Sequence, residues 1–186
     1  MEEKGPWVAQ GIIGKARIVD LLFDTYSRLV VAHVAKEVAD KRPLKSLYAR
    51  HTNEESYRLF TPVSEKLSYE DVVLSPTGPF MFVNIFEALV DDGKFDGSFN
   101  WHSLQKIELP SGRIVLELKA GELEPRVGHY STWVAGIVGI SNDEETVFVR
   151  LAIPQEKENK LRYCLVKLRP TQRNYEVITE LTGGYL

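Results

Sequence analysis

The chain of 186 residues is 44% hydrophobic and 26% charged, which excludes a disordered polypeptide and supports a single folded domain over residues 1–186. Its formal net charge of −3 at pH 7 repels phosphate backbones, so a nucleic-acid partner is not favoured and would need a local basic cluster. One cysteine, no signal-peptide pattern at the start and no run of about 18 apolar residues lead us to expect a cytoplasmic protein without a membrane span.

Residues 15–42 contain no glycine or proline, and their apolar residues recur at intervals of three and four. These residues are Val19, Leu22, Phe23, Tyr26, Val30, Val34 and Val38. The spacing predicts one helix with an apolar face, and Asp20, Asp24 and Arg28 follow one another at four-residue steps on another face. The β-branched residues of RLVVAHVAKEV favour two strands instead. The sequence leaves both alternatives open.

Further helices are predicted before residue 95. Thr52 and Glu55 form the side-chain pattern that caps the start of a short helix. In GPFMFVNIFEALVDDG, Pro79 suits a first helical turn, and apolar residues run almost all the way round the segment. We therefore expect a buried helix over 79–92 and a helical part that extends over about 15–95.

After residue 100 the apolar residues alternate, which is typical of strands. Six strands are predicted, at 101–109, 113–119, 131–140, 145–153, 160–169 and 174–181. In the fifth, the apolar phase slips between Leu165 and Val166, which predicts a bulge or a strand that is apolar on both faces. The expected fold is α+β, with a helical N-terminal half packed on a mostly antiparallel β-meander over about 100–182 that can close partly into a barrel.

The segment from Asp96 to Lys119 resembles the metal-binding strands of the restriction-endonuclease-like nucleases. In that family an acid near a strand start, and a second acid two residues before a lysine, hold a divalent metal and position the attacking water. Here Asp96 precedes Glu117, and Glu117 and Lys119 share one strand face. The resemblance covers about 25 residues and implies a Mg²⁺-dependent nuclease in which Lys119 stabilises charge. The chain departs from the family at Phe95, where a proline commonly precedes the acid.

The same charges have a purely structural interpretation. With a two-residue turn at Ser111 and Gly112, the segment LQKIELPSGRIVLELK forms a hairpin that places Lys106 opposite Glu117. All the apolar side chains then share one face, and Lys106 and Glu117 form a cross-strand charge pair. We prefer this interpretation, which needs no cofactor; Mg²⁺ belongs only to the nuclease alternative.

Aromatic residues and histidines gather near two predicted strand starts. The candidate binding residues are Trp101, His102, His129, Tyr130, Trp133 and Tyr163. Aromatic faces with imidazole tips suit a partner whose contact is partly apolar and partly hydrogen-bonded. The leading hypothesis is an intracellular, non-catalytic binding or protein-interaction module whose partner is an unknown protein or a small apolar ligand. The sequence sets no oligomeric state.

Two basic clusters are the local candidates for nucleic-acid binding. They are Lys41, Arg42, Lys45 and Arg50, and Lys157, Lys160, Arg162, Lys167, Arg169 and Arg173. Because Glu156 and Glu158 interrupt the second cluster, we interpret it as a solvated surface.

Overall fold

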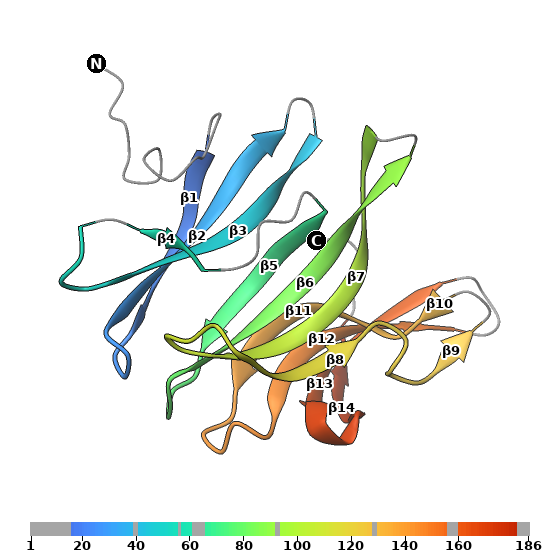
Figure 1. The fold of residues 1–186 in the computed structure, drawn as a ribbon. Helices are drawn as coiled ribbons and strands as arrows, with labels where there is room; N and C mark the ends of the chain where they lie inside the picture. The colour runs from blue at the N-terminus through green and yellow to red at the C-terminus, as the bar shows by residue number, and fades with distance from the viewer. Residues whose placement is uncertain are drawn as a thin grey trace.

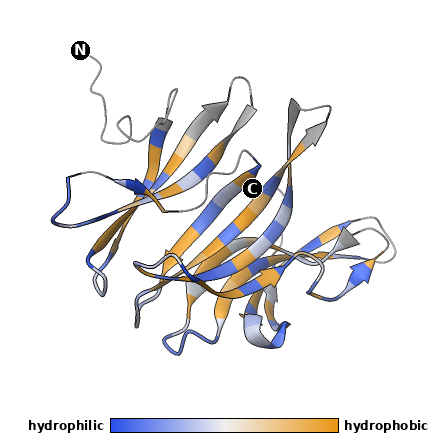
Figure 2. Cartoon of the chain, in the orientation of Figure 1, coloured by the Kyte–Doolittle hydropathy of each residue, from blue (hydrophilic) through white to orange (hydrophobic). Residues whose placement is uncertain are grey.

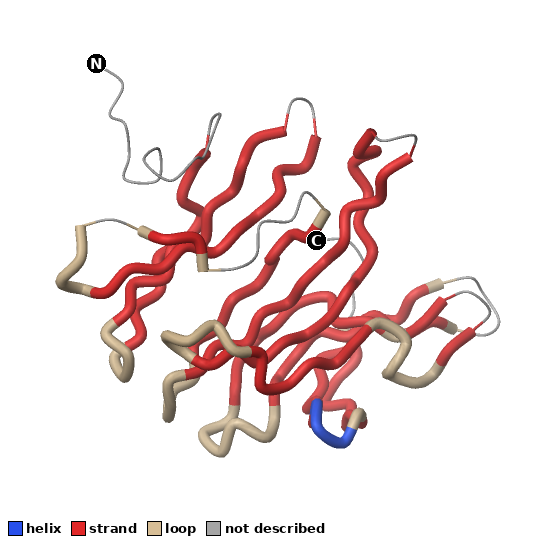
Figure 3. Tube along the Cα trace, in the orientation of Figure 1, coloured by secondary structure: helices blue, strands red, loops and turns tan. Residues whose placement is uncertain are grey.

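The computed structural model describes residues 16–38, 41–55, 57–60, 66–91, 94–127, 130–155 and 160–181. Their regular structure is β, apart from one short 3-10 turn, η2 (Pro170–Gln172), as Figure 3 shows. The first eight strands are β1 (Ala16–Asp24), β2 (Leu29–Val38), β3 (Lys41–His51), β4 (Arg58–Leu59), β5 (Leu67–Leu74), β6 (Phe80–Asp91), β7 (Lys94–Glu108) and β8 (Ile114–Lys119). The others are β9 (Arg126–Val127), β10 (Tyr130–Ser131), β11 (Trp133–Ile140), β12 (Val147–Pro154), β13 (Leu161–Arg169) and β14 (Asn174–Glu180).

Three four-stranded antiparallel sheets follow one another along the chain (Figure 1). We call them the N-terminal sheet (β1–β4), the central sheet (β5–β8) and the C-terminal sheet (β11–β14). In each sheet the strands lie side by side in chain order, so every sheet is a meander, while β9 and β10 pair separately. None of the three sheets closes on itself, so the expected partly closed barrel is wrong.

The N-terminal half is β, so the expected α+β class is wrong. The described residues between 16 and 38 form the β1–β2 hairpin, which turns at Arg28, where φ is 54°. Leu22 and its cross-strand partner Val31 face the central sheet, whereas Ala32 belongs to a small cluster on the opposite face. Apolar residues on both faces produce three- and four-residue intervals without a helix, and the β-branched residues favour the strands. The two-strand alternative is confirmed.

The buried helix expected over 79–92 is instead β6, which pairs with β5 on one side and β7 on the other. Met81 and Val83 pack against the N-terminal sheet, while Phe82 packs against the C-terminal sheet. Because both faces of β6 are covered, its sequence is apolar all round and lacks the alternation of a half-exposed strand. The short helix expected after Thr52 is also wrong, since a turn lies there.

All six strands predicted after residue 100 are present, as β7, β8 and β11–β14. They belong to two sheets rather than to one meander, because β7 and β8 continue the central sheet beside β5 and β6. The bulge predicted in β13 between Leu165 and Val166 is wrong for that strand, which pairs with β12 without a shift; a bulge lies opposite these residues, on β14. Leu165 pairs with Thr179 and Val166 with Val177, which leaves Ile178 of β14 without a partner across the strands.

The central sheet is the middle of three layers. One of its faces packs on the N-terminal sheet, in a core of Leu29, Val31, Leu47, Ala49, Tyr69, Met81, Val83, Ile85, Ile107 and Leu109. The other face packs on the C-terminal sheet, in a core that includes Phe82, Trp101, Leu104, Leu118, Val134, Val147, Val149, Leu151, Cys164, Val166 and Leu168. The orange hydrophobic bands that cross the strands in Figure 2 include these rows. Their removal from water is the main force that holds the layers together.

Polar side chains also join the N-terminal and central sheets. The Lys45 ammonium group of β3 donates to one carboxylate oxygen of Glu70 in β5 at 2.8 Å, and the Ser68 hydroxyl donates to the other at 2.7 Å. Nearby, the Nε2 atom of His33 in β2 donates to the Tyr69 carbonyl oxygen. His33, Ser68 and Glu70 are buried. Each group thus depends on a partner in the network, which fixes the position of one sheet on the other.

Acid is expected to destabilise the protein through His33. Burial lowers the pKa of its imidazole below the ordinary value of 6.5, and the hydrogen bond to Tyr69 opposes part of this effect. The unfolded chain therefore takes up a proton at higher pH than the folded chain does. The free energy of unfolding should fall as the pH decreases below about 6.5. An NMR titration of the His33 ring, with chemical denaturation at several pH values, tests this expectation. A folded-state pKa at or above 6.5 would contradict it.

Candidate functional site

The structure does not bring Asp96 to Glu117. Asp96 lies in β7, and Glu117 of β8 pairs with Gln105, nine residues beyond Asp96 on the same strand. On β6, Gln105 pairs with Val83, and Phe95, the neighbour of Asp96, pairs with Val90; seven residues of β6 correspond to about 23 Å. Carboxylates that share a metal ion must both lie within about 2.6 Å of it. The geometry gives the nuclease alternative no support.

Glu117 and Lys119 do project from one face, as predicted. The Lys119 Nζ atom lies 3.2 Å from a carboxylate oxygen of Glu117, and the Gln105 side-chain amide donates to Glu117 at 2.8 Å. Burial alone would raise the pKa of Glu117, but hydrogen bonds from Gln105 and Lys119 outweigh burial and lower this pKa. Glu117 therefore has its partners within the β7–β8 hairpin.

The predicted pairing of Lys106 with Glu117 is wrong by one residue. Lys106 pairs with Leu116, so the Lys106 and Glu117 side chains lie on opposite faces of the central sheet. The partner of Lys106 is Glu144, in the turn between β11 and β12, at 2.6 Å. This ion pair connects the central sheet to the C-terminal sheet.

A longer turn, which shifts the register by two residues, and an unpaired residue on β8, which shifts it back by one, together cause the change of register. The Glu108 N–H donates to the Arg113 carbonyl oxygen at 2.9 Å, which closes a loop over residues 109–112 in place of the expected two-residue turn. Gly112 lies in this loop with φ of +73°, a conformation that glycine adopts without steric cost. On β8, Val115 has no partner across the strands, and this irregularity shifts the pairing that follows.

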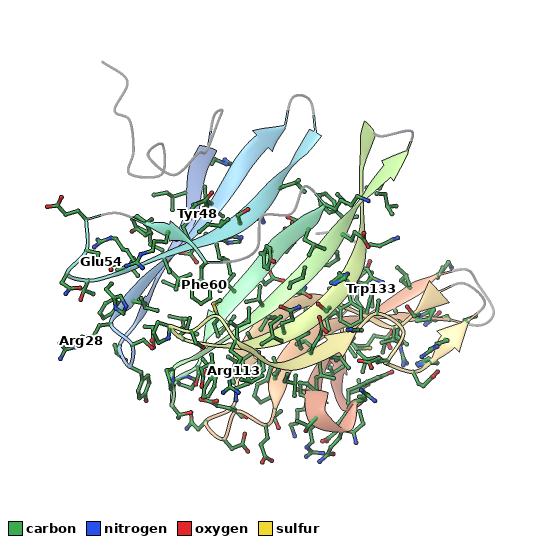
Figure 4. The ribbon with its side chains drawn as sticks, viewed as in Figure 1. Arg28, Tyr48, Glu54, Phe60, Arg113 and Trp133 are labelled. Carbon is green, nitrogen blue, oxygen red and sulfur yellow. The ribbon has the colours of Figure 1, made fainter. Side chains whose placement is uncertain are left out.

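Trp101 and Trp133 lie where the central and C-terminal sheets meet. Trp101 is 7% exposed, and its indole N–H donates to the Asn84 side chain at 2.9 Å. Trp133, labelled in Figure 4, is half-buried and meets Phe86 edge to face, with ring centres 5.8 Å apart. Both tryptophans pack between sheets, and a ligand site beside them stays a prediction.

The other predicted binding residues are dispersed. His102 in β7 and Tyr163 in β13 are half-buried and belong to different sheets. Tyr130 lies in β10, but its side chain is outside the described residues, as is all of His129. Among the members whose side chains are described, only Trp101 and Trp133 belong to the core between the central and C-terminal sheets.

A pocket of about 230 Å³ opens between the N-terminal sheet and the turn of the β7–β8 hairpin. It is lined by Leu29, Ala49, Arg50, His51, Glu54, Arg58, Leu59, Phe60, Pro110, Ser111 and Gly112. Figure 4 labels Glu54 and Phe60 near the N-terminal sheet, and Arg113 on the hairpin. The two sides are close, since a β-carbon at Gly112 would lie 3.7 Å from the Phe60 ring. We call this hollow the turn pocket.

Charged side chains form the rim of the turn pocket. Arg50 donates to the Glu54 carbonyl oxygen at 2.7 Å and lies 5.2 Å from the centre of the Tyr57 ring. Arg58 forms an ion pair with the Glu54 carboxylate. That carboxylate also accepts the His51 N–H at 3.0 Å, and this bond, aided by the charge of Arg58, lowers the pKa of Glu54. Two guanidinium groups therefore accompany one carboxylate on the rim.

Only Arg50 of the turn pocket belongs to a basic cluster identified in the sequence. The cluster does not act as one surface, because Lys45 is engaged by Glu70 between the sheets. The side chains of Lys41 and Arg42 lie outside the described residues. Leu29 and Pro110 are far apart in sequence and line one pocket only because the first two sheets stack, so no local pattern indicated the site.

The chain matches no protein-family model and no curated protein sequence. In the part of the chain that the structure describes, no helix has the length and apolar character of a membrane span. Within the same part, no three Asp, Glu, His or Cys side chains gather as metal ligands. The turn pocket is therefore the candidate site that geometry favours.

Proposed function

We propose that this protein is an intracellular, non-catalytic binding module that takes a segment of a partner protein into the turn pocket. The observation that supports this proposal is a pocket of about 230 Å³ in which an apolar floor lies beneath an arginine rim. An apolar floor holds a side chain by removing it from water. Arginine adds charge-assisted hydrogen bonds to a carboxylate.

The pocket geometry favours an acidic residue next to a large apolar one in the partner. Leu29 and Ala49 of the floor are buried and offer only apolar surface. The volume of about 230 Å³ is below the range of roughly 300–1,000 Å³ that holds a drug-sized ligand, so it suits one inserted side chain. The Arg58 side chain is 71% exposed, so it can turn from Glu54 to a carboxylate of the partner at little cost.

A short peptide with phenylalanine flanked by aspartates is expected to bind and to shift the amide NMR signals of Arg50, His51 and Gly112. A matched peptide with asparagine in place of aspartate should bind about 10–100-fold more weakly, because charge-assisted hydrogen bonds are lost. Titration of both peptides, followed by heteronuclear NMR, measures the ratio. Equal affinities would contradict the proposed role of the arginine rim.

Two variants test whether the peptide binds in the turn pocket. Ser111→Trp places a large side chain at the exposed mouth of the turn pocket and should abolish peptide binding while the fold persists. Thr171→Trp, in the exposed turn η2, is the matched control and should bind as the parent does. Binding that survives Ser111→Trp would place the site elsewhere.

A further inference from the structure

Glu54 places a carboxylate of the chain itself at the rim of the turn pocket. Among the residues that the structure describes around this pocket, Glu54 is the one acid, and Arg50 and Arg58 are the arginines. One oxygen of the Glu54 carboxylate forms an ion pair with Arg58, and the other accepts the His51 backbone N–H at 3.0 Å. The cation that the rim offers to a partner is therefore already engaged in the free protein.

Backbone contacts hold Glu54 in this position. The Glu54 N–H donates to the His51 carbonyl oxygen at 3.0 Å, which closes a turn over residues 51–54. Arg50 donates to the Glu54 carbonyl oxygen at 2.7 Å. The side-chain bond to the His51 N–H then fixes the carboxylate over its own turn. Arg58 of β4 is 71% exposed, so it is the member of the ion pair that can move.

Glu54 is ionised at neutral pH. The hydrogen bond from the His51 N–H lowers the pKa of this carboxyl group, and the charge of Arg58 adds to that effect. A carboxylate that approaches Arg58 from a partner therefore meets a negative charge beside the guanidinium group. The two carboxylates repel each other and compete for the same cation.

We propose that Glu54 is a built-in competitor for the turn pocket, whose carboxylate holds Arg58 until a partner's carboxylate displaces it. This inference rests on the proposed function of the turn pocket. Glu54 precedes Arg58 by four residues in the same chain, so it competes at an effective concentration of mM order. A free carboxylate in solution therefore gains little at the rim. A segment that also buries an apolar side chain on Leu29 and Ala49 gains further free energy and displaces Glu54.

The first experiment compares Glu54→Gln with the parent by NMR titration with the phenylalanine–aspartate peptide of the preceding section. The glutamine side-chain oxygen can still accept the His51 N–H, but the negative charge beside Arg58 is gone. The variant is expected to bind the peptide about 3–10-fold more tightly. Glu55→Gln is the matched control, because Glu55 is an exposed neighbour that does not line the pocket. It should change the affinity by less than about twofold.

A second experiment tests whether the competition passes through Arg58. Arg58→Gln should weaken binding of the peptide, because one cation of the rim is lost. Adding Glu54→Gln to Arg58→Gln should then change the affinity by less than about twofold, since no guanidinium group is left at this position to release. General repulsion between Glu54 and the peptide would instead give the same gain in both backgrounds.

A third experiment tests the requirement for an apolar side chain. A peptide with alanine in place of phenylalanine keeps its carboxylates but cannot fill the floor of the pocket. The parent should bind this peptide at least about 10-fold more weakly than the phenylalanine peptide. Glu54→Gln should recover about 3–10-fold of that loss, because the carboxylates then meet no competitor.

The outcomes separate this inference from the function on which it rests. A parent protein that binds neither peptide would refute the proposed function, and the inference with it. A parent that binds the phenylalanine peptide, while Glu54→Gln binds it no more tightly than Glu55→Gln does, would refute the inference alone. A gain from Glu54→Gln that persists in full beside Arg58→Gln would also overturn it, because Glu54 would then act without holding Arg58.

Discussion

Replacement of Glu144 with glutamine is expected to lower the free energy of unfolding by about 2–4 kcal/mol. The Glu144 carboxylate accepts hydrogen bonds from Lys106 at 2.6 Å, from Thr77 at 2.9 Å and from Ser75. The side chains of Glu144 and Lys106 are only 11% and 18% exposed. Glutamine would leave the ammonium group of Lys106 largely withdrawn from water without its counter-charge. The same change would weaken the link between the central and C-terminal sheets.

Chemical denaturation of the parent and the Glu144→Gln variant measures this effect. Glu145→Gln is the matched control, because Glu145 is the exposed neighbour in the same turn and should change the free energy of unfolding by no more than about 0.5 kcal/mol. Adding Lys106→Met to Glu144→Gln should restore part of the lost stability, since the buried unpaired charge is then gone. Equal effects of Glu144→Gln and Glu145→Gln would contradict the proposed importance of the ion pair.

The Glu144 ion pair also has a pH signature. Burial alone would raise the pKa of Glu144, but hydrogen bonds from Lys106, Ser75 and Thr77 outweigh burial and lower this pKa below the ordinary value of 4.5. A carboxyl group whose pKa is lower in the folded state stabilises the protein above the unfolded-state pKa, and that contribution is lost as the pH falls through the folded-state pKa. The difference in stability between the parent and Glu144→Gln should therefore persist at neutral pH and shrink below about pH 4.5.

Replacement of Asn84 with leucine is also expected to lower the free energy of unfolding by about 2–4 kcal/mol. Asn84 is fully buried in β6. Its carbonyl oxygen accepts the indole N–H of Trp101 at 2.9 Å, and its amide donates to Asp71 at 3.1 Å and to the Val134 carbonyl oxygen at 3.2 Å. Leucine fills similar space but leaves the buried Trp101 N–H without an acceptor and removes a hydrogen bond to the C-terminal sheet.

Two observations test the Asn84 prediction. Chemical denaturation measures the change in the free energy of unfolding. Asn100→Leu, on the exposed surface of β7, is the control, and its free energy of unfolding should stay close to that of the parent. The indole N–H signal of Trp101 should move in the NMR spectrum of Asn84→Leu, because its hydrogen bond is lost. Asn84→Asp should also destabilise at neutral pH, since it puts a second carboxylate beside Asp71. An unchanged indole signal would contradict the assigned contact.

The strands after residue 100 could be predicted because several of them have one buried face. Val147, Val149, Leu151 and Ile153 alternate along β12, and all four are buried against the central sheet as expected. Alternation of apolar and polar residues could not identify β6 as a strand. Both of its faces are covered, and periodicity alone does not distinguish a strand buried on both faces from a buried helix. It failed at residues 16–38 for a related reason, since Val31 and Ala32 are buried on opposite faces of β2.

The division into sheets and the candidate site depend on contacts between distant segments. Alternation placed β7 and β8 correctly, yet nothing local shows that they pair beside β5 and β6 and not with β11. The loop over residues 109–112 moves the hairpin register by two residues, and the unpaired Val115 moves it back by one, so Lys106 is displaced by one residue from its predicted partner. The partner of Lys106 is Glu144, 38 residues away in another sheet. The turn pocket is likewise assembled only when the N-terminal and central sheets stack.

The central claim is that the β5–β8 sheet is a middle layer with a separate apolar core on each face. Methyl NOE spectroscopy of the protein with labelled Ile, Leu and Val tests it most directly. The structure predicts NOEs between Val31 or Leu47 and Val83, and between Val149 and Leu104 or Leu118, because these residues share the two cores. No NOE should join Val31 or Leu47 to Val149. Cross-peaks between the two groups, or helical sequential contacts through residues 16–38, would contradict the three-layer β architecture.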